Sequence, residues 1–188
     1  YGDHGGAEVS ETTPVRPQSE RAQRRVDAER ALRLWAPTQG ACLTILRVPG
    51  IYAADRLPLE RLYSKTPALL PEEDAYSNHI QSDDLASLIC AAVYHGKPQR
   101  VINACDGGQT KMGDYFDAVA DVFQLPRPPR LSKKELASTL DPMMLSFMSE
   151  SRRIKNHRLR ELKFHLQYPT VDDYLSFTSK YLLSPRSD

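Results

Sequence analysis

Apolar residues recur at helical spacing in the first part of the chain and then form a nearly continuous run, which predicts a helix followed by a buried strand. Ser19 is placed to cap the helix, and the helical pattern ends near Ala36. Residues 42–48 are mostly apolar and precede Pro49-Gly50, as expected for a buried strand. The buried face of the helix is predicted to contain Ala28, Ala31, Leu32 and Trp35.

A second helix and a second strand follow in the same order. Asp83 and Asp84 are expected to cap the helix, His95-Gly96 to end it, and residues 100–104 to form the strand. Helices that alternate with buried strands are typical of an α/β fold. The predicted apolar stripe of this helix is Leu85, Leu88, Ile89 and Ala92.

A third helix is predicted after Thr110, its expected N-cap, and the proline-rich residues 125–130 then separate it from a helical tail. One more short helix is expected at 59–63, inside a stretch that contains several prolines. The third helix should bury Met112, Tyr115, Phe116, Val119 and Phe123. The tail helices are predicted from Ile154, Leu159 and Leu162, and from Val171, Tyr174, Leu175, Thr178 and Leu182.

Composition excludes several classes of partner. The formal net charge is +1, so the overall field attracts neither nucleic acid nor an acidic membrane surface. The sequence has neither a signal peptide nor an apolar run long enough to span a membrane, which predicts a cytoplasmic protein. No set of side chains has metal-ligand spacing. The cysteines have apolar neighbours and are expected to be buried, inert thiols: Cys42, Cys90 and Cys105.

Short motifs in a characteristic order resemble the extended short-chain dehydrogenase/reductases, also called the NAD-dependent epimerase/dehydratase family. The resemblance covers nearly the whole chain but only the second half of the family pattern, and the Tyr1 start without a preceding element suggests a chain that begins inside a domain. The motifs are Tyr1-Gly2-Asp3, Ala28-Glu29, Leu46-Arg47-Val48-Pro49-Gly50-Ile51-Tyr52, Asn78-His79-Ile80, Asp83-Asp84-Leu85-Ala86, Ile102-Asn103-Ala104 and Ser151-Arg152-Arg153-Ile154.

The resemblance implies an α/β fold: the C-terminal part of a Rossmann-like parallel sheet with a mostly helical substrate-binding lobe. We expect a partial Rossmann-like domain at 1–124, with an excursion into the substrate lobe at about 53–76, and the rest of the lobe at 125–188. The implied cofactor is NAD or NADP, although the chain lacks the glycine-rich loop that binds the pyrophosphate. The residue that would distinguish NAD from NADP is likewise expected outside this sequence.

Two arginines occupy the positions of the family's catalytic tyrosine and lysine, counted back from Ala28-Glu29. Arg21 replaces the tyrosine and cannot exchange a proton, because a guanidinium stays protonated at any usable pH. Arg25 replaces the lysine and could still hold a ribose or a phosphate. The alternative is a solvated basic helix face that pairs with Glu20 and Glu29.

The resemblance also implies that other residues line the site. Pro49, Gly50 and Ile51 follow the strand that ends beside the nicotinamide, where backbone groups contact the cofactor. Tyr52 and His79 are the proton donors to test in place of Arg21, and both are also candidate substrate-binding residues. For His79 the alternative is a histidine with structural hydrogen bonds. Asn78 belongs to the same predicted substrate cleft.

A basic cluster near residue 155 is predicted to lie on one short helix: Arg152, Arg153, Lys155, Arg158 and Arg160. By resemblance, residues of this region such as Arg152 meet the diphosphate of a nucleotide-linked substrate, and a solvated face is the alternative. Nucleic-acid binding is disfavoured because no stacking aromatic residues alternate with the charges.

Two functional hypotheses follow. The first is an NAD(P)-dependent oxidoreductase or sugar-nucleotide epimerase/dehydratase that acts on a small or nucleotide-linked substrate, which the sequence does not identify. The second is a non-catalytic NAD(P)-responsive binding or scaffold protein. A homo-oligomer is possible in either case. The isolated chain should also leave a sheet edge and an apolar helix face uncovered.

Overall fold

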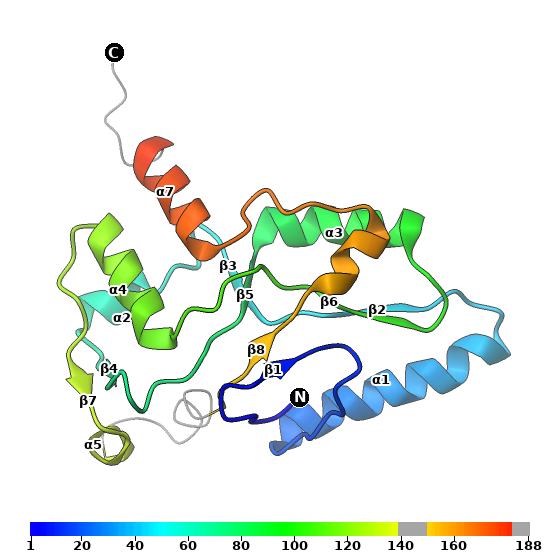
Figure 1. Cartoon of the computed structure of the whole chain (residues 1–188), viewed down its shortest axis with the longest axis horizontal. Helices are drawn as coiled ribbons and strands as arrows, with labels where there is room; N and C mark the ends of the chain where they lie inside the picture. Colours follow the sequence, from blue (N-terminus) through cyan, green and yellow to red (C-terminus); the bar gives the residue numbers. More distant parts are fainter. Residues whose placement is uncertain (139–149, 182–188) are drawn as a thin grey trace.

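The computed structural model describes residues 1–138 and 150–181, which form an α/β structure (Figure 1). Helices α3 and α1 lie on opposite sides of the β2–β6 pair, while α2, α4 and α5 gather in a separate group. The elements are β1 Glu8–Val9, α1 Glu20–Thr38, β2 Thr44–Arg47, β3 Gly50–Tyr52, α2 Leu59–Tyr63, β4 Ala68–Leu69, β5 His79–Gln81, α3 Ser82–His95, β6 Arg100–Asn103, α4 Met112–Val122, β7 Arg130–Leu131, α5 Lys133–Ala137, β8 Arg153–Ile154, the 3-10 helix η1 His157–Leu162 and α7 Val171–Tyr181.

The named strands of the described residues form parallel pairs, in agreement with the predicted α/β class. β2 pairs with β6 from Thr44 opposite Arg100 to Arg47 opposite Asn103. β3 pairs with β5, so the end of the Pro49-Gly50 turn runs beside His79. The pairs β1–β8 and β4–β7 connect segments that are far apart in the sequence. Strand pairing therefore holds the tail against the first half of the chain.

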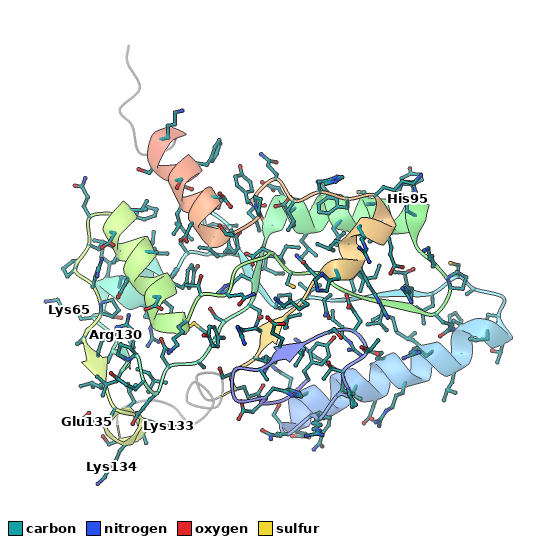
Figure 2. The ribbon with its side chains drawn as sticks, in the orientation of Figure 1. Lys65, His95, Arg130, Lys133, Lys134 and Glu135 are labelled. Carbon is teal, nitrogen blue, oxygen red and sulfur yellow. The ribbon has the colours of Figure 1, made fainter. Side chains whose placement is uncertain are left out.

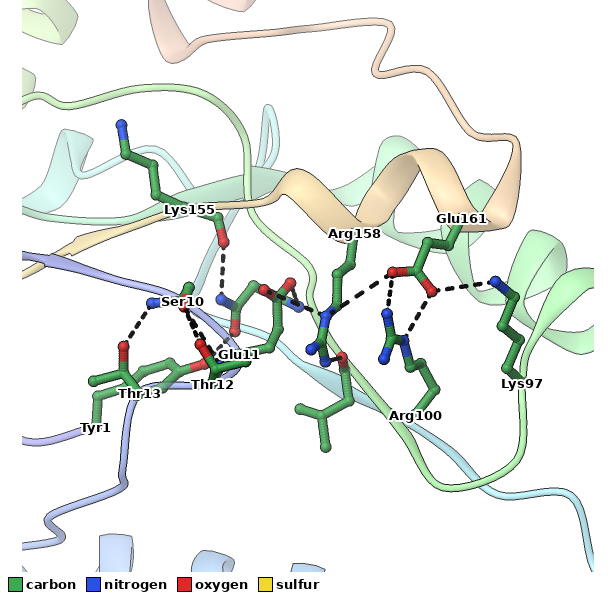
Figure 3. Close-up of polar contacts among 12 residues, drawn as sticks. Tyr1, Ser10, Glu11, Thr12, Thr13, Lys97, Arg100, Lys155, Arg158 and Glu161 are labelled. Carbon is green, nitrogen blue, oxygen red and sulfur yellow. Dashed lines mark hydrogen bonds and ion pairs between the residues drawn. The ribbon is translucent and has the colours of Figure 1, made fainter.

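Side chains close the edge of β6 that faces away from β2 (Figure 3). Arg158 donates through Nη1 to the carbonyl of Val101 over 2.9 Å. The Asn103 N–H donates to Glu11 over 3.0 Å, and its side-chain amide donates to the carbonyl of Lys155 over 2.8 Å. These contacts replace the hydrogen bonds that a neighbouring strand would make.

Helix α1 has the predicted cap, but its predicted buried face is wrong. The Ser19 hydroxyl accepts from the Ala22 N–H over 3.3 Å, and the helix continues past Ala36, its buried residue. Leu32 and Trp35 are 46% and 55% exposed. The inward side of the helix instead carries Glu29, which binds Arg47 of β2 through two hydrogen bonds of 2.7 and 3.0 Å. Apolar residues at helical spacing therefore did not show which face of α1 the rest of the chain covers.

Helix α3 lies where it was predicted, but its cap and one buried position were wrong. Gln81, not an aspartate, caps the helix by accepting from the N–H groups of Asp83 and Asp84. Asp84 is buried and accepts from the N–H groups of Gln167 and Tyr168 over 2.7 and 2.9 Å, so it holds the tail on α3. The outward-facing Ile89 is 50% exposed, whereas Leu88 is fully buried.

Helix α4 buries the predicted Tyr115, Phe116 and Val119, and Met112 and Phe123 pack against the same core. Its N-cap is Lys111 rather than Thr110, because the Thr110 carbonyl accepts from both the N–H and the hydroxyl of Ser77 and places that residue outside the helix.

Arg130 links α4 to β7 and β4 (Figure 2). Its guanidinium lies 2.7 Å from Asp117 and 3.6 Å from the buried Asp74, and it donates to the carbonyl of Leu69. Asp74 also accepts from the Gly113 N–H over 2.8 Å. A Cβ at position 113 would lie 1.5 Å from Arg130, so this packing requires glycine.

The tail differs from the prediction in its first element and agrees in its last. Ile154 lies in β8, and Leu159 and Leu162 lie in η1, because pairing with β1 extends the chain at 153–154. The short helix α2 and the last helix α7 form as predicted, with Val171, Tyr174, Leu175 and Thr178 buried. Leu182 lies outside the described residues.

The cysteine prediction holds for one residue of three. Cys105 is buried, whereas Cys42 and Cys90 are exposed. Cys90 belongs to the outward-facing side of α3, and Cys42 precedes β2. Apolar neighbours in sequence did not ensure burial, because Cys90 faces outward on α3 and Cys42 lies outside any helix or strand.

Candidate functional site

The Pro49-Gly50 turn brings β3 against His79 at the start of β5. The Gly50 N–H donates to the Asn78 carbonyl over 3.1 Å. A Cβ at Gly50 would lie 2.9 Å from Cδ2 of His79, so a larger residue would displace the imidazole. Gly50 is exposed, while Pro49 and Ile51 are partly buried. Of the three predicted cofactor-contact positions, Gly50 therefore offers the most accessible backbone.

Tyr52 lies within a group of aromatic rings that we call the tyrosine cluster: Tyr52, His79, Tyr115, Tyr168 and Tyr174. The Tyr52 ring centroid is 5.3 Å from that of Tyr174 and 6.1 Å from that of His79. The Tyr52 side chain is only 1% exposed. Burial raises the pKa of its hydroxyl far above the usual value, and the carboxylates of Asp106 and Asp84 raise it further. Tyr52 is therefore a protonated phenol.

The imidazole of His79 is neutral in this environment. Its ring centroid is 4.8 Å from that of Tyr115, and burial lowers the pKa of His79 to about 4 because the charged form loses its hydration. A neutral imidazole can accept or donate a hydrogen bond, but it lacks the acidic second proton that an imidazolium gives up. The structure thus places the two predicted site residues, Tyr52 and His79, close together. Their chemistry differs, because Tyr52 is a protonated phenol and His79 a neutral imidazole.

Asp106 is a member of this region that the sequence did not single out. It follows β6, is 3% exposed, and its N–H donates to the His79 carbonyl over 2.7 Å. One carboxylate oxygen, Oδ1, accepts from the Gly108 N–H over 3.0 Å. Burial raises the pKa of Asp106 to about 7, while the hydrogen bond from Gly108 and the Tyr52 hydroxyl oppose that rise. A single aspartate after a strand has no sequence signal that marks it as a site residue.

Asn78 holds β8 through both polar atoms of its side-chain amide. Its Nδ2 donates to the Arg152 carbonyl over 2.9 Å, and its Oδ1 accepts from the Ile154 N–H over 2.7 Å. The predicted site residues Asn78 and Arg152 are therefore in contact. Asn78 thus fixes the backbone that carries Arg152, with one donor and one acceptor site of its amide in use.

Arg152 is held by protein groups on one side of its guanidinium. Its Nη1 lies 2.7 Å from a Glu150 oxygen and 3.1 Å from the Gly2 carbonyl. Its Nε is buried and has no hydrogen-bond partner in the described structure. Arg152 thus remains the candidate for contact with an anionic substrate group, although one carboxylate already neutralises part of its charge.

The basic cluster does not lie on one helix, as the sequence predicted. Arg153 lies in β8, Arg158 and Arg160 lie in η1, and ion pairs spread across both elements. Lys155 is 2.8 Å from Glu8, and Arg158 is 3.9 Å from a Glu11 oxygen. The charges mainly attach the tail to the first part of the chain.

The two arginines that the sequence motifs assign to the family's tyrosine and lysine positions lie on α1. Both Arg21 and Arg25 are exposed. Glu20 pairs with Arg24, and Glu29 pairs with Arg33 and Arg47, so both acidic residues pair with basic residues, two of them on α1, as the solvated-face alternative expected. The tyrosine cluster, in contrast, is built from β3, β5, α4 and α7, together with Tyr168 just before α7.

Across residues 1–138 and 150–181, no group of three or more His, Cys, Asp or Glu side chains is arranged to hold a metal ion. Within the same ranges, no helix combines the length and the apolar character that crossing a membrane requires.

No family model matches the sequence, and no curated protein matches it. Solved structures do match it. A conserved protein of unknown function from Silicibacter pomeroyi is 32% identical, with a TM-score of 0.82 over 96% of this chain and 62% of that chain. A Methylobacillus flagellatus structure named for the NAD-dependent epimerase/dehydratases is 25% identical, with a TM-score of 0.65 over 94% of this chain and 57% of that chain.

This chain has the fold of the NAD-dependent epimerase/dehydratase family. The human epimerase family protein SDR39U1, solved with NADPH, shares that fold at 14% identity and a TM-score of 0.78, over 96% of this chain and 62% of that chain. The chain thus spans about three fifths of the length of these structures. The resemblance that the sequence motifs indicated is confirmed.

Proposed function

We propose that the protein is an NAD(P)-dependent oxidoreductase or epimerase/dehydratase that acts in the cytoplasm on a small or nucleotide-linked substrate. The observation that carries the proposal is the fold shared with the epimerase/dehydratase structures, some of which were solved with NADPH or NAD. When bound, the dinucleotide supplies or accepts the hydride. The residues of this chain would position the nicotinamide end of the dinucleotide and transfer a proton to or from the substrate.

The residues present fit part of such a cofactor. The backbone at Gly50 is exposed and carries no side chain, which suits close approach by a flat ring from the side that His79 does not occupy. Exposed Arg25 can donate from a planar fork to a ribose hydroxyl or a phosphate. The sequence contains no glycine-rich phosphate loop, so the fit extends only to the nicotinamide and its ribose.

In this proposal Tyr52 donates the proton and neutral His79 orients the reacting oxygen. Tyr52 keeps its proton because its pKa is raised, and a phenol can both donate and accept a hydrogen bond. Because Tyr52 is 1% exposed, the rings around it must separate before a substrate can reach the hydroxyl. Arg152 would bind the anionic part of a nucleotide-linked substrate.

The second candidate, a non-catalytic NAD(P)-responsive binding or scaffold protein, is supported by one specific observation. Arg21 and Arg25, which the sequence motifs assign to the family's proton-transfer pair, are exposed and can hold a ligand but cannot exchange a proton, while Tyr52 is enclosed.

Calorimetry with NADPH and a hydride-transfer assay over carbonyl and sugar-nucleotide substrates distinguish the two. We expect Arg25→Gln to weaken NADPH binding about tenfold, whereas Arg24→Gln, one position away, should leave it unchanged. If turnover is found, Tyr52→Phe should lower it by about 100-fold or more. Binding without turnover across the panel would reject the enzyme, and turnover that depends on Tyr52 would reject the scaffold.

A further inference from the structure

Two buried oxygen atoms in the tyrosine cluster region lack hydrogen-bond partners within the described structure: the Tyr52 hydroxyl and Oδ2 of Asp106. They belong to residues that are 1% and 3% exposed. Both residues lie beside His79, whose carbonyl accepts from the Asp106 N–H over 2.7 Å and whose ring centroid is 6.1 Å from that of Tyr52. Each of the two side chains also shifts the pKa of the other. Leaving two such groups unsatisfied is costly, so a small displacement that joins them is favoured.

The surroundings of the pair are rich in acidic groups. From α3, Asp84 acts on both members, and from α7, Asp172 acts on Asp106. Cys105 adjoins Asp106 and has a raised pKa, so it is a neutral thiol. Other neighbours of Tyr52 are neutral rings: Tyr115 from α4, Tyr174 from α7 and His79 from β5.

We propose that Asp106 is a positioning residue that switches the Tyr52 hydroxyl between two hydrogen-bonding directions. When Asp106 is ionised, its Oδ2 can only accept, so the Tyr52 O–H points to Asp106 and is withheld from any ligand. When Asp106 is protonated, it donates to the phenol oxygen, and the Tyr52 O–H becomes free to point away from Asp106.

The position of the pair explains why Asp106 can change its protonation state in the folded protein. Burial and two nearby carboxylates oppose ionisation, and the Gly108 N–H and the Tyr52 hydroxyl support it, which places the pKa of Asp106 at about 7. Tyr52 itself stays protonated over this range. Near neutral pH, therefore, the Asp106 carboxyl group gains or loses its proton, and the Tyr52 O–H changes its hydrogen-bonding direction.

The inference rests on the proposed function only where it concerns a ligand, since the switch itself can be observed without turnover. The test is NMR of the protein labelled at the tyrosine ring carbon that bears the hydroxyl, with the Tyr52 signal assigned by its loss in Tyr52→Phe. We expect the signal to move between two plateaus with a midpoint near pH 7, and to stay constant in Asp106→Asn. The matched control Asp172→Asn should keep the transition and shift its midpoint to lower pH.

A flat Tyr52 signal in the unmodified protein, or a transition that persists in Asp106→Asn, would overturn the inference. Should Asp106→Asn fail to fold, the Asp106 carboxyl carbon in Tyr52→Phe gives an independent test. Loss of the phenol donor should raise its midpoint, and an unchanged midpoint would also overturn the inference. Absence of turnover with an intact transition would reject only the proposed function.

Discussion

Asp106 and His79 are joined by a backbone hydrogen bond, yet burial moves their pKa values in opposite directions. The pKa of Asp106 rises to about 7 and that of His79 falls to about 4, because burial disfavours the charged form of each group. The sequence identified His79, Tyr52 and Asn78 through family motifs but gave no reason to select Asp106. The chemistry of Asp106 depends on its burial and on distant carboxylates, which residue order does not encode.

The raised pKa of Asp106 predicts a stability that falls as pH rises. Below the unfolded-state pKa of about 3.8, Asp106 is protonated in both the folded and the unfolded protein. Between that value and about 7 the folded protein binds more protons, so the stability that the raised pKa contributes is lost as the pH rises. Wild type should lose roughly 2 to 3 kcal/mol relative to Asp106→Asn between pH 5 and pH 8. Urea unfolding of both proteins at these pH values measures the difference.

The comparison with Asp106→Asn is needed because His79 acts with the opposite sign. A lowered folded pKa costs stability as pH falls below about 6.5, since the unfolded state then binds more protons. The pH dependence of wild-type stability alone contains the opposite contributions of both Asp106 and His79. Equal pH dependence in wild type and Asp106→Asn would show that Asp106 has an ordinary pKa in the folded protein.

At the scale of elements, local patterns predicted where helices and strands form better than what holds them together. The bounds of α2, α3 and β6 follow caps, glycines and prolines within a few residues. β8, however, is two residues long and exists because it pairs with β1 and binds Asn78. Such an element has no periodicity of its own, so the sequence suggested a helix there.

Asn78→Ala should therefore release β8 from the body of the protein. We expect faster amide hydrogen exchange at Arg153 and Ile154, and a loss of about 1 to 3 kcal/mol of unfolding free energy from the two missing hydrogen bonds. Asn78→Asp keeps the acceptor for Ile154 but loses the donor to Arg152, so its effect should be intermediate. Unchanged exchange at Ile154 in Asn78→Ala would show that β1 alone holds the strand.

At the scale of the whole molecule, the two edges of the β2–β6 pair differ. Side chains of Glu11 and Arg158 close the outer edge of β6. In the described residues β2 pairs only with β6, and the flanking helices leave large apolar side chains exposed: Leu32, Leu34 and Trp35 on α1, and Ile89, Val93 and Tyr94 on α3. An open edge with such faces is typical of a surface that another part of a protein covers.

The isolated 188-residue chain should accordingly bind an apolar dye. Leu34→Lys and Val93→Lys, at positions 77% and 75% exposed, should together lower dye fluorescence roughly twofold without loss of stability, because neither side chain is packed. Arg30→Lys on the same surface of α1 is the control. A monomer that unfolds cooperatively and binds no dye would contradict this prediction.

By itself the sequence determined the α/β class, most element positions and the family resemblance, because caps, breakers and apolar spacing act within a few residues of one another. Tertiary structure alone decided which apolar faces are covered, that Asn78 anchors β8, and that Asp106 and Tyr52 both lie beside His79. Each of those depends on contacts between segments far apart in the chain, where burial sets both packing and charge. The proton-transfer residues illustrate this division. The sequence established that Arg21 cannot exchange a proton, whereas only the fold placed Tyr52 and Asp106 near each other, away from α1.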